Sequence, residues 1–179
     1  MKIGSSHAHR ENMGRLLYVG KYLERENYRL NGTRIQRYLK IVNGFLKNPE
    51  LTDEDAWALI ELEELYVILK IAERHNIISR KEISICVKGA HYLDDELANN
   101  SGNAPRNYSF QLYIAAKMLA FNMDASIPSH ASEADVWFLC DGIKIPVECK
   151  RLYAAGEIEQ IVKNACSQVS KRVARKAMG

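Results

Sequence analysis

The sequence contains no apolar run near the roughly 18–20 residues that a membrane-spanning helix needs. The first residues, MKIGSSHAHRENMG, lack the apolar stretch that is typical of a secretory signal peptide. Proline and glycine are also sparse, with four and ten copies in 179 residues, which leaves no room for a long flexible linker. We therefore expect one globular domain or two small ones, and no membrane partner.

Paired cysteines are absent as well. Cys86, Cys140, Cys149 and Cys166 stand singly, and no two of them form a CxxC pair. This pattern disfavours a structural zinc site. Scattered single cysteines in a chain of this size are typical of reduced thiols, so the expected location is the cytoplasm.

The chain as a whole lacks a large excess of either charge, because 25 Lys and Arg against 22 Asp and Glu give a net charge of +3. The distribution is uneven. Residues 142–179 hold eight Lys or Arg and three acids, and the remainder is slightly acidic. A basic surface near a site suits a ligand with a phosphate backbone. A solvated helix face rich in Lys and Arg explains the same pattern equally well.

Helical patterns dominate residues 10–100, where apolar residues recur with the spacing of one helix face. Two helix starts carry capping signals: Thr52 precedes a run of acids, and Ser79 is spaced with Glu82 as a capping box. The polar stretch NNSGNAP at 99–105 then interrupts the pattern. Residues 1–100 are therefore predicted to form an all-helical domain.

Residues 106–179 have a different pattern, which predicts the order helix, strand, strand, strand, helix. Asp141-Gly142 is a strong hairpin signal, and the flanking segments ADVWFLC and IKIPVECK have the composition or the alternation of strands. The expected elements are a helix at 107–120, strands at 125–128, 134–140 and 143–150, and a helix from 156 onward. The fold class is thus α/β, with an N-terminal all-helical region followed by a smaller α-β-β-β-α core.

The second strand of the predicted hairpin places two charged residues side by side. Because side chains alternate across a strand, Ile143, Ile145, Val147 and Cys149 share one face and can pack into a core, whereas Glu148 and Lys150 share the other. Asp135 is the only acid in ADVWFLC. In a hairpin that turns at Asp141-Gly142, it should lie opposite Glu148, so both carboxylates meet at the open end.

This combination suits the hydrolysis of phosphodiesters. Two carboxylates can hold Mg²⁺ (or Mn²⁺), which prefers oxygen ligands and keeps several waters. The metal ion activates a water molecule and neutralises developing charge, and a lysine beside it can stabilise that charge or orient the water. The alternative is structural, namely a hairpin in which Lys150 forms a salt bridge with Asp135 and Glu148.

The run ADVWFL-CDG-IKIPVECKR resembles the D…ExK signature of the PD-(D/E)xK (restriction-endonuclease-like) nuclease superfamily, and RNYSFQLYIAAKML resembles the helix that opens that core. The resemblance covers residues 106–171. It implies that Asp135, Glu148 and the Cys149 carbonyl bind metal and that Lys150 is the catalytic lysine. The opening helix often carries a glutamate, for which this chain has Gln111. Gln168 on the last helix would point at the site, although a position at the margin of the helix surface is equally compatible.

The resemblance further implies a strand after the last helix, so the core at 106–179 is expected to be incomplete. Either the chain is a fragment of a longer protein, or another segment completes the sheet.

The predicted function is a metal-dependent endonuclease acting on DNA, in defence or repair. The alternative is a weak or inactive nuclease-fold module that binds nucleic acid or a protein partner, with the helical region as the docking part. Cleavage of both strands by one site per chain would favour a homodimer.

Trp57 and Trp137 are expected in the core rather than as stacking platforms. The basic residues that could contact phosphates are Arg151, Lys171, Arg172, Arg175 and Lys176.

Overall fold

The computed structural model describes residues 6–45, 52–75, 78–90, 104–128, 134–150 and 158–177. The chain divides into two compact units, Met1–Ser109 and Phe110–Gly179. The division falls inside a helix, a few residues after the predicted start of the second domain at 106. Of the predicted break at 99–105, the structure describes Ala104 and Pro105, which open that helix; the other residues of the break lie outside the described ranges.

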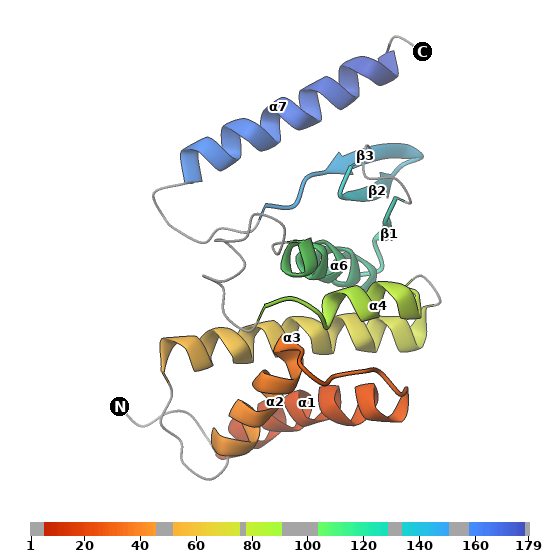
Figure 1. Cartoon of the computed structure of the whole chain (residues 1–179). Coiled ribbons are helices and arrows are strands. Elements are labelled where there is room, and N and C mark those ends of the chain that lie inside the picture. The colour runs from red at the N-terminus through yellow and green to blue at the C-terminus, as the bar shows by residue number, and fades with distance from the viewer. Residues whose placement is uncertain are drawn as a thin grey trace. The chain divides into compact units, whose positions relative to one another are not determined.

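The first unit is helical, as the sequence predicts. Its helices are α1 (Ser6–Arg25), α2 (Arg34–Phe45), α3 (Asp53–Arg74) and α4 (Arg80–Cys86), and the first turns of α6 (Ala104–Ala120) also belong to it. Both α1 and α2 pack against α3, as Figure 1 shows in red, orange and yellow. None of the helices in the described ranges is both long and apolar enough to cross a lipid bilayer.

Two helix starts confirm the predicted caps. The Thr52 hydroxyl accepts a hydrogen bond from the backbone N–H of Asp55, and Ser79 does the same for Glu82. In each pair the acid side chain accepts a hydrogen bond from the N–H of the capping residue. These reciprocal bonds satisfy two of the backbone donors that a helix leaves without partners at its N-terminus.

The core of the first unit contains a buried charged network that the sequence did not reveal. The Glu61 carboxylate contacts the guanidinium groups of both Arg34 and Arg106, which are each only 1% exposed. Arg106 also donates to the hydroxyl of Tyr38 at 2.8 Å, and Arg34 donates to the backbone oxygen of Cys86 at 2.6 Å. Buried charges require such partners, because their desolvation costs several kcal/mol per ion.

The second unit is built on a small antiparallel sheet in the order β1 (Asp124–Ser126), β2 (Val136–Cys140), β3 (Ile143–Val147). The rest of α6 precedes this sheet, and α7 (Ile158–Ala177) follows it and contacts β3 (Figure 1). The turn between β2 and β3 confirms the predicted hairpin. Asp141 and Gly142 have φ angles of 49° and 77°, and two consecutive positive values are what a two-residue hairpin loop of the primed type requires.

One face of the sheet packs on α6, but only near one end. Ala115 of α6 forms a buried cluster with Ala125 and Val136, and the half-buried Val147 and Cys149 pack against it. The prediction that Ile143 and Ile145 also enter a core is wrong, since they are 66% and 39% exposed. The alternation is as predicted, but the buried cluster does not reach the turn end of β3.

The described residues thus give a mixed α/β chain with an N-terminal helical region and a three-stranded antiparallel sheet.

Along α7 the half-buried positions are Ile161, Ala165 and Val169, whereas Ile158 and Val162 are 47% and 53% exposed. Trp57 is 46% exposed, so its predicted place in a core is wrong. Trp137 is 8% exposed, which confirms that this residue is buried.

Candidate active site

The register of the hairpin brings Asp135 and Glu148 to the same end of the sheet. Val136 pairs with Val147 as the last pair of the β2–β3 ladder. Continuing this antiparallel register by one step places Asp135 opposite Glu148, as the sequence predicts. Both residues lie immediately beyond the strands, where the ladder ends and side chains of neighbouring strands can turn toward a common point.

Two hydrogen bonds fix the carboxylate of Asp135. The side-chain amide of Gln111 on α6 donates to Oδ1 at 2.9 Å, and the backbone N–H of Cys149 donates to Oδ2 at 2.8 Å. One bond comes from the helix under the sheet and the other from the adjacent chain segment. Because each carboxylate oxygen can accept more than one bond, both retain capacity for a further ligand.

Lys150 lies within reach of both acids. Its Nζ is 3.9 Å from Asp135 Oδ2 and 3.5 Å from Glu148 Oε2. These distances are longer than the roughly 2.7–2.9 Å of a charge-assisted hydrogen bond. The lysine therefore balances the negative charge of the pair without closing tightly on either carboxylate.

Burial differs sharply among the three charged groups. The side chain of Glu148 is 2% exposed, that of Asp135 18% and that of Lys150 33%. A carboxylate as buried as Glu148 needs a nearby cation, because desolvation disfavours its charged form. Burial and, secondly, the negative charge of Asp135 raise the pKa of the neighbouring Cys149 thiol to about 12. This thiol is therefore neutral near pH 7.

The donor set fits a hard divalent cation such as Mg²⁺ or Mn²⁺. Asp135 and Glu148 supply oxygen atoms, and Mg²⁺ is often held by one or two carboxylates while it keeps several waters. The described ranges contain no group of three or more His, Cys, Asp or Glu able to hold a metal ion. A zinc-like site with several side-chain ligands is thus not present among these residues, whereas a water-rich site with two carboxylates matches the geometry.

None of the described contacts links the other predicted site residues to Asp135, Glu148 or Lys150 in the predicted role. Gln168 lies on the exposed side of α7, and its role in catalysis stays a prediction. Cys149 contributes its N–H to Asp135, while the predicted use of its carbonyl as a metal ligand also stays a prediction. Among the basic residues, Lys171 is exposed; Arg151 and the side chains of Arg172, Arg175 and Lys176 lie outside the described residues.

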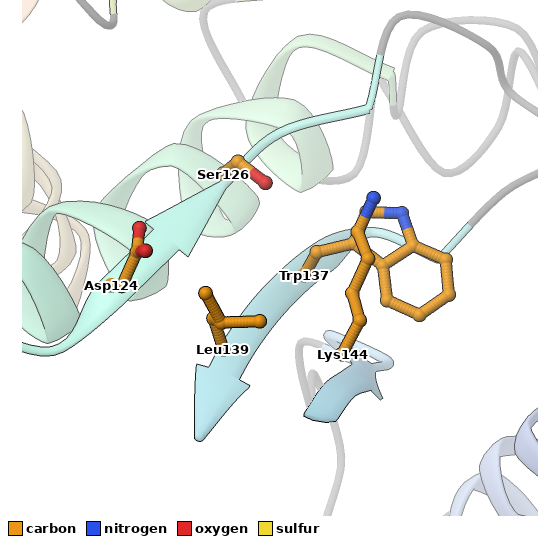
Figure 2. A pocket seen from close by; sticks show the side chains of 5 residues that line it. All are labelled: Asp124, Ser126, Trp137, Leu139 and Lys144. Atoms are coloured by element: carbon orange, nitrogen blue, oxygen red, sulfur yellow. The ribbon is translucent and has the colours of Figure 1, made fainter. Parts of the chain in front are cut away.

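A pocket on the sheet was missed by sequence reasoning. It has a volume of about 220 Å³ and is open to solvent (Figure 2). Trp137 forms one wall, and the ammonium nitrogen of Lys144 lies 4.7 Å from the centroid of its ring. Strand alternation is enough to predict that Trp137 and Lys144 share a face. The pairing of β1 with β2, which adds Asp124 and Ser126 to the pocket, has no comparably strong signal in the sequence. The lining residues are Asp124, Ser126, Trp137, Leu139 and Lys144.

Comparison with known proteins adds no relative to these observations. No family model matches the chain, and no curated protein and no solved structure matches it. The geometry of Asp135, Glu148, Lys150 and Gln111 is therefore the basis for assigning a function, and the resemblance to PD-(D/E)xK nucleases stays a prediction from the sequence motif.

Proposed function

We propose that this chain is a metal-dependent nuclease of the PD-(D/E)xK type that hydrolyses phosphodiester bonds of DNA with Mg²⁺ or Mn²⁺. The observation that carries the proposal is the position of Lys150 between the carboxylates of Asp135 and Glu148. Asp135, which precedes β2, comes together with Glu148 and Lys150, which follow β3, at the open end of the hairpin. The second unit then represents part of a restriction-endonuclease-like core.

Asp135 and Glu148 would hold the metal ion, with the carbonyl of Cys149 as a third oxygen. When bound, the metal ion would polarise the phosphate and lower the pKa of a coordinated water. The protein's part is to keep the carboxylates oriented. Gln111 and the N–H of Cys149 do this for Asp135 by fixing both of its oxygens.

Lys150 would act on the attacking water or on the phosphate of the substrate. Its ammonium group is one-third exposed and is held at Coulombic range rather than in a short ion pair. A cation placed in this way can orient the attacking water or stabilise the charge that develops on the phosphate. The neutralising effect of Lys150 on the acids also limits the cost of burying Glu148.

The experiment that tests the proposal is cleavage of supercoiled plasmid DNA with Mg²⁺ or Mn²⁺ by the wild-type chain and by Lys150→Met. Lys40→Met is the matched control, because Lys40 is an exposed lysine on α2. We expect the wild type and the control to cut, and Lys150→Met to be slower by about two to three orders of magnitude. Equal cutting by all three proteins would exclude Lys150 from the chemistry.

A second candidate function is a nuclease-fold module without activity that binds nucleic acid or a protein partner. The observation in its favour is Gln111, which contacts Asp135 where an acid would add a metal ligand. The ion pairs of Lys150 with both acids would then have a structural role only. Binding of DNA without metal-dependent cleavage by any of the three proteins would support this alternative. A helical region that docks a protein is part of the proposal in either form, whereas a homodimer that cuts both strands belongs to the nuclease alone.

A further inference from the structure

The pocket lies on β2 and β3, the two strands whose ends lead to the acid cluster of Asp135 and Glu148. Asp124 pairs with Leu139, which pairs with Lys144 on the other side, so these residues form one row across the strands. Ser126, Trp137 and Pro146 form the next row. Because alternate residues of a strand share a face, these two rows lie on one side of the sheet. The same register, continued past the strand ends, places Asp135 opposite Glu148. There the carboxylate of Asp135 accepts a hydrogen bond from Gln111 of α6, the helix that packs on the other side of the sheet.

The spacing between the two features suits neighbouring parts of one extended ligand. A strand rises by roughly 3.3 Å per residue, so successive rows are about 7 Å apart and Lys144 lies about 13 Å along β3 from Glu148. Trp137 occupies the intermediate row. A nucleic-acid strand whose phosphate is at the acid cluster, at the end of the sheet, can therefore run along the strands and reach the pocket.

The walls of the pocket have the chemistry of a site for a flat, polar-edged ring. Trp137 and Leu139 provide apolar surface, and the view in Figure 2 shows the ammonium end of Lys144 over the indole ring. Asp124 offers a hydrogen-bond acceptor and Ser126 both a donor and an acceptor. At about 220 Å³ the cavity is below the range of roughly 300–1,000 Å³ that is typical of sites for larger small molecules.

We propose that this pocket binds an unpaired nucleobase of the substrate strand, with Lys144 moving to the adjacent phosphate. The base would stack on the ring face of Trp137 that Lys144 covers, a role that the sequence does not predict for this residue. Asp124 would accept a hydrogen bond from an exocyclic amino group. Lys144 is exposed and its contact with the ring is a weak cation–π interaction, so a stacking base can replace it. The proposal rests on the proposed nuclease function and specifies its substrate class as nucleic acid with a single-stranded segment.

The test uses Trp137 as its own reporter. The chain has two tryptophans, and Trp57 is 46% exposed, so Trp57→Phe leaves Trp137 as the only source of indole fluorescence. This protein is titrated in EDTA with a short single-stranded oligodeoxycytidylate and with a blunt duplex. We expect the single strand to quench Trp137 and to bind more tightly than the duplex, because a paired base cannot enter the pocket.

Substitutions of the exposed pocket residues Lys144 and Asp124 test binding without changing the buried core. In the same background, Lys144→Met should weaken binding of the single strand by about fivefold. It should also reduce the slope of log affinity against log salt by about 1, because one phosphate contact is lost. Lys40→Met should change neither quantity. Asp124→Ala should reduce the preference for oligodeoxycytidylate over oligodeoxythymidylate, since thymine lacks the exocyclic amino group.

Two results would overturn the proposal: no change of Trp137 fluorescence with the single strand, or an unchanged affinity and salt slope in Lys144→Met. Because EDTA prevents metal-dependent cleavage, these measurements do not depend on catalysis. A chain that binds through the pocket but does not cut plasmid DNA would keep the base site and exclude the nuclease. A chain that cuts plasmid DNA but shows no response of Trp137 would do the opposite.

Discussion

The side-chain amide of Gln111 donates a hydrogen bond of 2.9 Å to Oδ1 of Asp135, so a neutral residue occupies the position from which a third acid could reach the cluster. The amide holds the carboxylate in place without adding charge. A carboxylate at position 111 would repel Asp135 when no cation is present and attract a cation when one is bound. The affinity of the cluster for metal can therefore be tuned at this position.

The first prediction concerns Gln111→Glu. We expect this change to lower the melting temperature in EDTA and to increase the stabilisation that Mn²⁺ provides, because binding to the folded state alone stabilises it. Gln160→Glu is the control, since Gln160 is exposed on α7 and bonds only to Asn164 among the described contacts. Thermal melts with and without Mn²⁺ measure both effects. An equal response to Mn²⁺ in the two variants would argue against a metal ion at Asp135.

The second prediction concerns the buried network of the helical unit. Glu61→Gln leaves Arg34 and Arg106 without their carboxylate, and we expect a loss of about 3–5 kcal/mol in the free energy of unfolding. Glu63→Gln is the matched control. Its ion pair with Arg15 at 3.0 Å involves side chains that are 37% and 40% exposed, so the loss should be below about 1 kcal/mol. Urea denaturation measures the difference, and similar losses in both variants would contradict the account of Glu61.

The third prediction concerns the hairpin turn. Gly142 has a φ of 77°, and an L side chain in this region costs about 1–2 kcal/mol. Gly142→Ala should therefore destabilise the hairpin that aligns Asp135 with Glu148. Gly14 lies in the interior of α1, and a Cβ added there has no neighbour within 4 Å apart from adjacent residues and the backbone of its own helix. Gly14→Ala should therefore stabilise its helix by about 0.5–1 kcal/mol. Opposite shifts of the melting temperature are expected, and a stabilising Gly142→Ala would show that the turn has another conformation.

The fourth prediction concerns thiol reactivity. Cys140 and Cys166 are exposed, whereas burial raises the pKa of both Cys86 and Cys149 to about 12. The thiolate is the reactive form, and it is scarce at Cys86 and Cys149 at pH 8. A disulfide reagent should modify Cys140 and Cys166 rapidly in the native protein and all four cysteines after denaturation. Rapid modification of Cys149 in the native state would mean that the region around Asp135 is open.

Much of the hairpin could be predicted from the sequence because its signals are local. The Asp141-Gly142 turn fixes the register, and the register places Asp135 opposite Glu148 at the open end. Lys150 follows Glu148 by two residues and is therefore predicted at the same end. The capping residues Thr52 and Ser79 are local signals of the same kind. In each case neighbouring residues determine the outcome, and no distant part of the chain has to be known.

The features that sequence reasoning missed depend on contacts between distant segments. Arg34 and Arg106 have the sequence context of surface arginines, and their burial follows only from the meeting of α2, α3 and the start of α6 at Glu61. The exposure of Ile143 and Ile145 depends on where the buried cluster over α6 ends. The exposure of Trp57 likewise could not be inferred from its place in an apolar helical pattern.

The most direct measurement of the central claim is binding of Mn²⁺ by calorimetry to the wild-type chain and to Asp135→Asn, with Asp141→Asn as the control at the exposed turn. If Asp135 and Glu148 share a divalent cation, the wild type and the control will bind one Mn²⁺ with similar affinity and Asp135→Asn will bind it at least tenfold more weakly. Equal binding by all three proteins, or no binding by the wild type, would contradict a metal-dependent site at this end of the sheet.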